Sequence, residues 1–261
     1  MSMKDKFAAQ LMTLHRQTEE DFPGVLRAVR EMGWPAVQIS GLRGWAARDI
    51  AAVLRETGLA TAGVHVLFER LEQELETVME EAALFGTRDI ICPYMPKEYQ
   101  HPDGYRHMRR VLNGIAERIA EKGFRFSYHH HAFEFATEVD GVSAIEYLLE
   151  PSEDNKIMAE IDTYWVKKGG RDPYEFLQAY ANRMPIIHLK DMSDDAAQTT
   201  AEIGTGSIDF APILLWGERH GIEWYAVEQD VCPGDPLDSL QLSLDNLHRL
   251  ADRLQRGERN L

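Results

Sequence analysis

Short apolar runs alternate along the chain with longer stretches of helical period. Most of the apolar runs are short and are bounded by glycine, proline or charged residues, which is typical of buried parallel strands. The predicted strands are Phe7–Leu14, Ala36–Ser40, Leu59–Leu67, Asp89–Pro93, Phe124–His130, Ile157–Ile161, Ile186–Lys190 and Trp224–Glu228.

The segments between these runs predict amphipathic helices. From Met108 to Ile119, apolar residues recur at three- and four-residue steps, which gives one apolar helix face. Glycines shortly before the following strand are expected to end helices. The clearest helices are Asp49–Thr57, Leu71–Phe85, Tyr105–Lys122 and Pro236–Leu254, and the glycines are Gly33, Gly58, Gly86 and Gly123.

The repeat length predicts the fold class. Eight strands in 261 residues leave roughly 33 residues for each strand and helix, the cadence of an α/β protein of the (β/α)₈ TIM barrel type. No Gly-x-Gly-x-x-Gly follows the first strand, which disfavours a dinucleotide-binding fold. No proline- or serine-rich linker divides the chain, so residues 1–261 are expected to form a single TIM barrel domain.

Composition narrows the class of protein. A hydrophobic fraction of 44% excludes disorder over most of the chain, and a net charge of −15 disfavours nucleic acid as a partner. No apolar run reaches the roughly 18 residues that a membrane span needs, and Met1–His15 lacks a signal-peptide pattern. Two distant cysteines form no disulfide framework. We expect a cytoplasmic protein with no membrane partner.

Polar side chains follow the last four predicted strands. In a TIM barrel these positions lie at the C-terminal rim, where active sites are built. The four segments are Tyr128-His129-His130-His131-Ala132-Phe133-Glu134-Phe135, Glu160-Ile161-Asp162-Thr163-Tyr164-Trp165, His188-Leu189-Lys190-Asp191 and Val227-Glu228-Gln229-Asp230. One carboxylate or imidazole from each strand would form a mixed oxygen and nitrogen site suited to a divalent metal ion. Without a cation, carboxylates packed together would raise one another's pKa.

These segments, together with Ile203-Gly204-Thr205-Gly206-Ser207-Ile208-Asp209-Phe210, resemble the sugar phosphate isomerase/epimerase family of the xylose isomerase-like TIM barrel superfamily. In the first half of the chain the resemblance rests on the strand cadence and on His65. It implies one divalent metal ion, with Mn²⁺ as the first expectation and Zn²⁺, Co²⁺ and Mg²⁺ as the others. Carried onto this chain, the implied metal ligands are Glu134, Asp162, His188 and Glu228.

Two positions depart from the family pattern. Relatives that epimerise free ketoses place the strand-five glutamate about where His129 stands, so His129 is the alternative ligand to Glu134. They also carry a histidine where this chain has Trp165. The second departure keeps a lyase or dehydratase open as an alternative to the isomerase.

The residue types suggest roles in proton abstraction next to a carbonyl, leading to an enediolate. Glu134 and Glu228 are the predicted catalytic carboxylates, and Lys190 is expected to hydrogen-bond a substrate oxygen. The predicted substrate-binding residues are His65, His129, His131 and Trp165, of which His129 and His131 share one strand face.

The sequence thus predicts a metal-dependent sugar or sugar phosphate isomerase or epimerase with a small carbohydrate substrate. The alternatives are a lyase or dehydratase acting on keto-sugars or inososes, a nucleic-acid enzyme of the same barrel type, and a non-catalytic sugar-binding barrel. A homo-oligomer is left open.

Two of these segments also have plainer interpretations. Asp162 alone is typical of a helix N-cap, and Gly204-Thr205-Gly206 is more typical of a turn than of a phosphate-binding loop.

Overall fold

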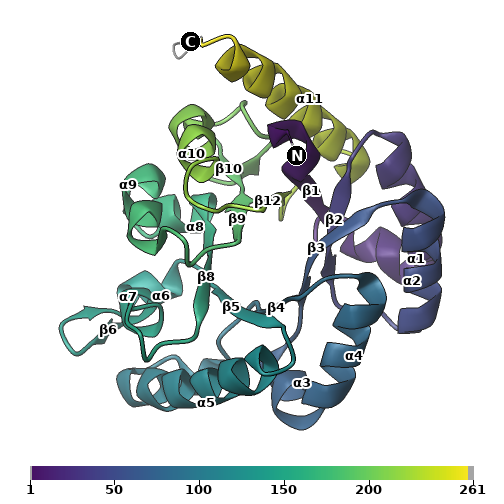
Figure 1. The fold of residues 1–261 in the computed structure, drawn as a ribbon. Coiled ribbons are helices and arrows are strands. Elements are labelled where there is room, and N and C mark those ends of the chain that lie inside the picture. The colour runs from purple at the N-terminus through teal and green to yellow at the C-terminus, as the bar shows by residue number, and fades with distance from the viewer. Residues whose placement is uncertain (1, 258–261) are drawn as a thin grey trace.

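The computed structural model describes residues 2–257, and eight parallel strands in it close into a barrel with the order β1-β12-β9-β8-β5-β4-β3-β2 (Figure 1). The predicted (β/α)₈ TIM barrel is therefore confirmed. Met1 and residues 258–261 of the predicted domain lie outside the described residues. The barrel strands are β1 (Phe7–Gln10), β2 (Ala36–Ser40), β3 (Ala60–His65), β4 (Asp89–Cys92), β5 (Arg125–His129), β8 (Met158–Asp162), β9 (Ile186–Leu189) and β12 (Trp224–Val227).

Helices surround this ring of strands on all sides. The longer ones are α1 (His15–Glu31), α2 (Ala47–Thr57), α4 (Leu75–Phe85), α5 (Pro102–Ala120), α10 (Phe210–Gly217) and α11 (Pro236–Gln255). The predicted helix over Leu71–Phe85 is two helices, α3 (Phe68–Gln73) and α4, because Glu74 has φ −129° and ψ 29°, outside the helical region. Gly58 and Gly86 end α2 and α4 in the left-handed conformation, as predicted.

The second half of the barrel carries short elements in place of single long helices. After β5 come α6 (Phe133–Ala136), the hairpin β6 (Glu138–Val139) and β7 (Val142–Ser143), and α7 (Ala144–Leu148). After β8 come α8 (Thr163–Lys168), α9 (Pro173–Leu177) and the 3₁₀ turn η3 (Gln178–Tyr180). The remaining short elements are η1 (Met3–Lys6), η2 (Lys97–Tyr99), β10 (Asp191–Met192) and β11 (Thr200–Ala201).

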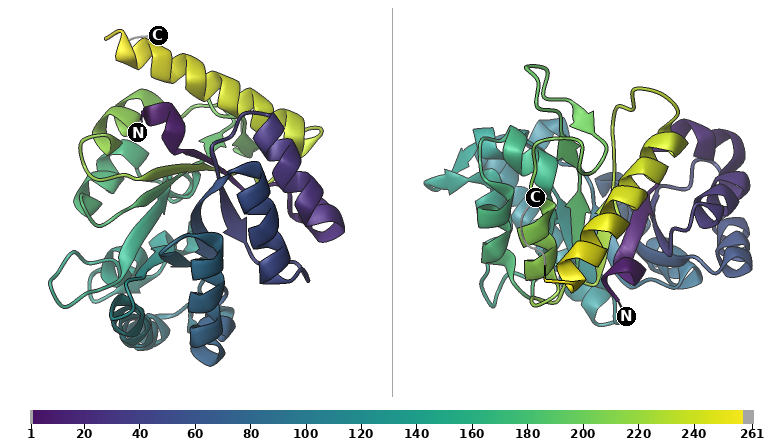
Figure 2. Two further views of the ribbon diagram at one scale, coloured as in Figure 1. Left: turned by 45° about the vertical axis from the view of Figure 1, so that its right-hand side comes forward. Right: turned by 90° about the horizontal axis from the view of Figure 1, so that it is seen from above.

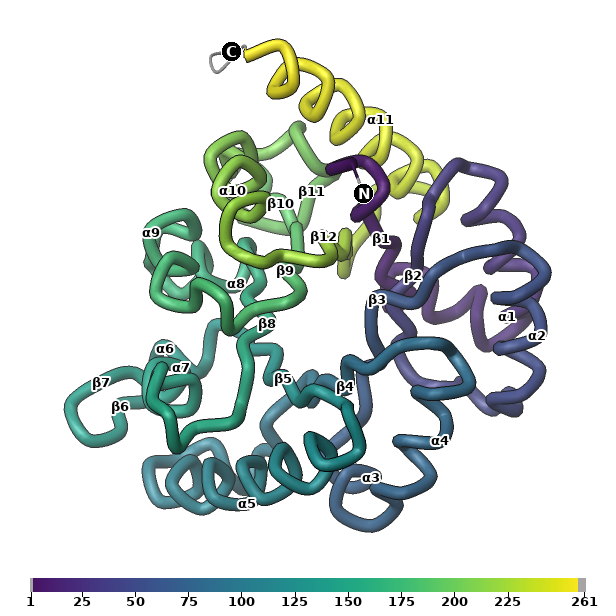
Figure 3. The backbone as a smooth tube through the Cα atoms, viewed as in Figure 1, coloured from purple at the N-terminus to yellow at the C-terminus, as the bar shows by residue number. Residues whose placement is uncertain are grey.

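The first and last described helices pack against each other. The tube in Figure 3 makes one circuit of the barrel, and α11 returns beside η1 (Figure 2). An ion pair of 2.6 Å joins Lys4 Nζ to Asp252 Oδ1 between these two helices. No helix among the described residues is both long and apolar enough to cross a membrane.

The barrel interior changes character along its axis. Apolar side chains form two small clusters inside the barrel. The main hydrophobic core lies between the strands and the helices. Toward the C-terminal ends of the strands, buried polar side chains replace the apolar ones. The two interior clusters are Ala8, Ala36 and Ala62, and Ile91, Ile186 and Ala226. The polar layer therefore rests on an apolar floor.

A buried ion pair ties β4 to β5 at the N-terminal end of these strands. Arg125 Nε and Nη2 each lie 2.7 Å from the carboxylate oxygens of Asp89, and Nη1 lies 2.6 Å from Glu223 Oε1. Burial raises the pKa of Asp89, and the hydrogen bonds from Arg125 oppose that shift. The guanidinium group therefore compensates a carboxylate that water does not reach.

Candidate metal centre

Four side chains from the ends of four neighbouring strands meet at the C-terminal rim. Asp162 ends β8 and pairs in register with His188 of β9, while His129 ends β5 and Glu228 follows β12. All four are buried, and one potential ligand atom from each lies within 4.8 Å of the others. We call His129, Asp162, His188 and Glu228 the outer group. Asp162, His188 and Glu228 are three of the ligands predicted from the sequence, and His129 is the predicted alternative to Glu134.

Asp162 combines two functions that the sequence presented as alternatives. Its Oδ1 accepts a hydrogen bond of 3.0 Å from the backbone N–H of Trp165, which makes Asp162 the N-cap of α8. Its Oδ2 is buried and accepts no hydrogen bond from the described residues. One oxygen therefore stabilises the helix while the other remains available as a ligand.

The two imidazoles of the outer group also present unpartnered atoms. Within residues 2–257, Nδ1 of His129 and Nδ1 of His188 are buried and make no hydrogen bond. Nδ1 of His188 lies 3.1 Å from Glu228 Oε2 and 3.8 Å from Asp162 Oδ2. Burial lowers the pKa of His188, but the charges of Glu160, Glu228 and Asp162 outweigh burial and raise it. Convergent, unpartnered nitrogen and oxygen donors fit a divalent cation.

Lys190 carries the positive charge that faces this group. Its ammonium nitrogen lies 3.2 Å from Asp162 Oδ2, 3.4 Å from Glu228 Oε1 and 3.0 Å from Asp230 Oδ2. Burial lowers the pKa of Lys190, but the three carboxylates outweigh burial and raise it, so the group is an ammonium. One ammonium does not balance these carboxylates, and a divalent ion beside it would reduce the excess negative charge.

Glu134 follows β5, as the sequence indicated, but its carboxylate makes its own set of contacts. It lies on α6, where its carboxylate accepts hydrogen bonds from Tyr128 Oη at 2.7 Å and from the backbone N–H of His131 at 2.8 Å. Burial raises the pKa of Glu134 to about 8. Among the described residues it does not join the outer group, in which His129 is the residue from β5. The ligand and catalytic roles assigned to Glu134 therefore stay predictions.

A second cluster lies directly beneath the outer group and was not predicted. Glu160 of β8 is fully buried, and its Oε2 lies 2.7 Å from His65 Nε2, 3.2 Å from His188 Nε2 and 3.3 Å from His129 Nδ1. Its Oε1 accepts a hydrogen bond of 2.6 Å from Gln38 Nε2. We call His65, His129, Glu160 and His188 the inner group, and its ligand atoms also lie within 4.8 Å of one another.

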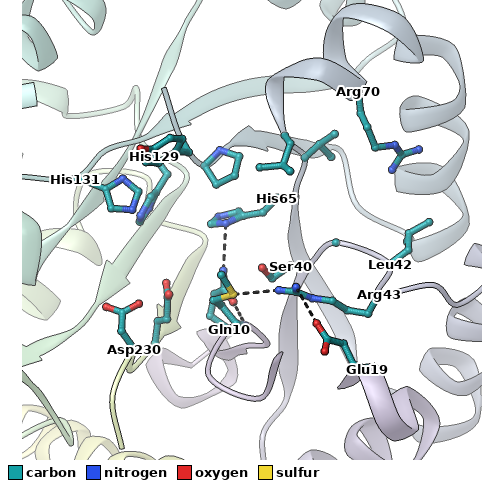
Figure 4. A pocket seen from close by; sticks show the side chains of 17 residues that line it. Gln10, Glu19, Ser40, Leu42, Arg43, His65, Arg70, His129, His131 and Asp230 are labelled. Carbon is teal, nitrogen blue, oxygen red and sulfur yellow. Dashed lines mark hydrogen bonds and ion pairs between the residues drawn. The ribbon is translucent and has the colours of Figure 1, made fainter. Parts of the chain in front are cut away.

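A cavity of about 850 Å³ opens above both groups. Among its lining residues are three of the predicted substrate-binding residues, His65, His129 and His131. Figure 4 shows His129 and His131 together with Asp230 opposite them, and His65 beside its partner Gln10. The fourth predicted residue, Trp165, packs against His131 with ring centroids 5.0 Å apart, and Lys190 Nζ lies 5.4 Å from its ring centroid.

The candidate phosphate-binding loop has no free amides at its glycines. The carboxylate of Asp191 accepts hydrogen bonds from the backbone N–H groups of Gly204, Gly206 and Ile208 at 2.9–3.1 Å. The ammonium group of Lys167 likewise donates to Ser207 O and Oγ, at 2.7 Å each. The segment is therefore a turn held against β10, which is the simpler of the two interpretations given in the sequence analysis.

Comparison with known proteins identifies the family. A model of the xylose isomerase-like TIM barrel matches residues 26–250. The chain therefore belongs to the xylose isomerase-like TIM barrel family.

Among curated relatives, an inosose dehydratase of Geobacillus kaustophilus is 27% identical over 288 aligned positions, which cover 90% of this chain and 92% of that protein. An inosose dehydratase of Clostridium botulinum is 28% identical over 49% of this chain and 48% of its own length.

Solved structures share the fold. A sugar phosphate isomerase/epimerase of Parabacteroides distasonis superposes with a TM-score of 0.78 at 21% identity, covering 94% of this chain and 98% of that one. The probable 3-DHS dehydratase AsbF of Bacillus anthracis, involved in petrobactin synthesis, has a TM-score of 0.70 at 14% identity, covering 93% and 98%.

Proposed function

We propose that this protein is a divalent-metal-dependent dehydratase of a cyclic polyhydroxy ketone of the inosose type. The observation that carries the proposal is the position of the carboxylates that line the cavity beside the outer group. Both, Glu228 and Asp230, come from the segment after β12 and so serve one side of a bound substrate. The similarity to an inosose dehydratase across 90% of the chain supports the same reaction class.

We assign the metal to the outer group, with His129 in place of Glu134. A divalent ion held by His129, Asp162, His188 and Glu228 would polarise the substrate carbonyl and stabilise the negative charge that develops on its oxygen. Two carboxylates and two imidazoles suit Mn²⁺, Zn²⁺ or Co²⁺.

Asp230 is the proposed proton acceptor. Its carboxylate lines the cavity, and its hydrogen bond to Lys190 Nζ at 3.0 Å fixes its position. It removes the proton from the carbon next to the substrate carbonyl, and the electron pair of that C–H bond forms the enediolate. Glu228, the base predicted from sequence, faces His188 and Lys190 and serves as a ligand in this assignment.

The same carboxyl group completes the elimination. Protonated Asp230 returns its proton to the hydroxyl on the next carbon, which departs as water as the carbon–carbon double bond forms. The substrate thus loses one hydrogen and one hydroxyl, and Asp230 is regenerated as a carboxylate. Lys190 donates a hydrogen bond to the substrate oxygen nearest Asp230, and the neighbouring Trp165 limits the access of water to that ammonium group.

An isomerase or epimerase would use the first half of the same chemistry. Epimerisation returns a proton to the opposite face of the carbon and therefore needs a second proton-transfer group across the cavity. In this cavity the wall across from Asp230 carries His129 and His131 (Figure 4). His129 is a metal ligand in this assignment, and burial lowers the pKa of His131 to about 3, so neither imidazole carries a proton to return to the substrate. Dehydration therefore fits the arrangement better.

Incubation in D₂O separates the two reactions. The Mn²⁺-loaded protein is given inososes, other keto-sugars and free ketoses, and the products are analysed by mass spectrometry. We expect loss of one water from an inosose and no rearrangement of the free ketoses. Solvent deuterium in an epimerised or rearranged sugar, without water loss, would instead establish the isomerase or epimerase and contradict the dehydratase.

A further inference from the structure

The inner and outer groups share His129 and His188, and each could hold a metal ion. We infer that the metal binds only in the outer group, and that Glu160 and Gln38 of the inner layer are positioning residues that hold His188 with Nδ1 toward the metal. This inference rests on the metal-binding part of the proposed function. It concerns Gln38 and Glu160, for which the sequence analysis predicted no role.

The direction of the hydrogen bonds around Gln38 determines the state of His188. A carboxylate only accepts hydrogen bonds, so the amide nitrogen of Gln38 must face Glu160 Oε1, at 2.6 Å. The amide oxygen of Gln38 then faces His188 Nε2, also at 2.6 Å, and an amide oxygen only accepts. His188 Nε2 therefore carries a hydrogen. In the neutral ring, Nδ1 is left with a lone pair.

That lone pair points into the outer group. Nδ1 of His188 lies 3.1 Å from Glu228 Oε2 and 3.8 Å from Asp162 Oδ2, and the latter oxygen accepts no hydrogen bond from the described residues. The ammonium group of Lys190, 3.2 Å from Asp162 Oδ2, balances part of this negative charge, and a divalent ion between the three electron-rich atoms would balance the rest. The outer group thus presents ligand atoms, His188 Nδ1 and Asp162 Oδ2, that a metal ion could bind without displacing a hydrogen bond.

Three of the four residues of the inner group, His65, Glu160 and His188, already use the atoms that a metal ion would need for hydrogen bonds. Gln10 Nε2 lies 3.2 Å from His65 Nδ1, which acts as acceptor, and His65 Nε2 then donates to Glu160 Oε2 at 2.7 Å. The chain of bonds from Gln10 through His65 and the chain from His188 through Gln38 both end on Glu160. A metal ion bound to Glu160 would have to displace these buried hydrogen bonds, each costly to lose.

Strand geometry explains why Glu160 and Gln38 lie directly beneath the outer group. Glu160 and Asp162 are two residues apart on β8, so they point to the same side of the sheet about 6.6 Å apart along the strand. A register shift between β2 and β3 falls at Val37 and Gln38, opposite Gly63. Irregular pairing of this kind re-aims side chains, and here it occurs at the residue that joins His188 to Glu160.

The direct test is the nitrogen that His188 uses to bind zinc. The full-length protein, labelled with ¹⁵N in its histidines and loaded with Zn²⁺, is studied by NMR, and His188 is assigned through loss of its signals in His188→Gln. We expect Nε2 to keep its hydrogen and Nδ1 to show the shift of a zinc-bound nitrogen. Zinc bound through Nε2, or two zinc ions per chain, would overturn the inference.

Two variants test, through the affinity for Mn²⁺, whether Gln38 and Glu160 position His188. Gln38→Leu and the isosteric Glu160→Gln should each weaken Mn²⁺ binding about 10- to 100-fold, the usual effect of removing a partner that orients a ligand. The matched control is Ser127→Ala, because Ser127 is a buried residue of β5 whose hydroxyl makes no hydrogen bond to the described residues. It should bind Mn²⁺ within twofold of the wild type.

The outcomes separate this inference from the proposed function. Mn²⁺ binding within twofold of the wild type in both support variants would overturn the positioning role of Gln38 and Glu160 while leaving the dehydratase in place. A wild-type protein that binds neither Zn²⁺ nor Mn²⁺ would overturn both. If a variant does not fold, the zinc measurement on the wild-type protein still decides between the two nitrogens of His188.

Discussion

At the scale of single residues, the site depends on side chains whose two polar atoms have different partners. Asp162 caps α8 with one oxygen and turns the other toward Lys190 and the outer group, and His188 contacts Gln38 with one nitrogen while its other nitrogen faces Glu228. In each case the first contact fixes the orientation in which the second atom can act. Substitutions that keep the first contact and remove the second are therefore the most informative.

Asp162→Asn is expected to remove metal binding while preserving the helix. Asparagine is as good an N-cap as aspartate, so the free energy of unfolding should change by less than about 1 kcal/mol. The loss of one ligand charge should weaken Mn²⁺ binding by at least about 100-fold, which titration of the stripped protein would measure. Asp172 caps α9 in the same way, with an acceptor distance of 2.9 Å from the Glu175 N–H, so Asp172→Asn is the matched control with unchanged affinity.

Asp230→Asn is expected to remove catalysis while leaving the metal in place. Replacing the proposed proton acceptor should lower kcat for an inosose by about 10²- to 10⁴-fold. The affinity for Mn²⁺ should stay within a few fold, because Asp230 is outside the outer group. Asp235 caps α11 from the same loop, and Asp235→Asn should leave kcat unchanged. A variant at Asp230 that retains more than about a tenth of kcat would return the base role to Glu228.

At the scale of elements, the two ends of the barrel serve different functions. The C-terminal ends of β5, β8, β9 and β12 carry the outer group, whereas the N-terminal ends of β4 and β5 carry the Asp89–Arg125 pair. Changes at the second place should affect stability and spare the chemistry.

Arg125→Met would leave the buried carboxylate of Asp89 without its charge partner. We expect a loss of about 3 kcal/mol in the free energy of unfolding, because the remaining charge has no compensation. Arg88→Met is the comparison, since Arg88 pairs with Glu223 at the exposed surface and such pairs contribute about 0–1 kcal/mol. Urea denaturation of the two variants measures both. An equal loss of unfolding free energy in both variants would show that the buried Asp89–Arg125 pair contributes no more than an exposed ion pair.

The elements themselves could be predicted because each barrel strand is an apolar run with its own boundaries. Ala36–Ser40 agrees with β2 at both ends, and the helix ends at Gly58 and Gly86 follow from the left-handed conformation that glycine adopts readily. The break at Glu74 could not be predicted, because glutamate favours a helix and only the packing of α3 and α4 places a turn there.

The site could be predicted in part for a related reason. Residues that end strands, such as Asp162, converge wherever the barrel closes, so strand order alone brings them together. The position of Glu134 depends on the path of the chain after β5, and the hydrogen bonds of Tyr128 and His131 hold its carboxylate on α6. Glu160 and Gln38 lie inside apolar runs, where a polar residue gives no signal of the partner that it meets across the barrel.

At the scale of the whole molecule, the acidic rim couples metal binding to stability. The outer group brings two carboxylates together in a buried layer, and Lys190 only partly compensates them. A bound divalent ion should therefore stabilise the folded chain relative to the unfolded one, in which the ligands are far apart.

Metal should raise the melting temperature. At a free Mn²⁺ concentration of 100 times Kd, the stabilisation is about 2.7 kcal/mol, equivalent to a rise in Tm of about 5–10 °C for a domain of this size. Differential scanning calorimetry with and without Mn²⁺ measures the shift, and Asp162→Asn should show almost none. An equal shift in the wild type and in Asp162→Asn would place the stabilising ion elsewhere.

The central claim is that metal held at this rim removes water from a cyclic polyhydroxy ketone. Its most direct test is mass-spectrometric detection of the product formed from an inosose by the protein stripped of metal, and by the same protein after Mn²⁺ is restored. The account predicts a product lighter by one water only when Mn²⁺ is present, and none with Asp230→Asn. Equal water loss by the metal-free protein, or an epimerised inosose of unchanged mass, would contradict it.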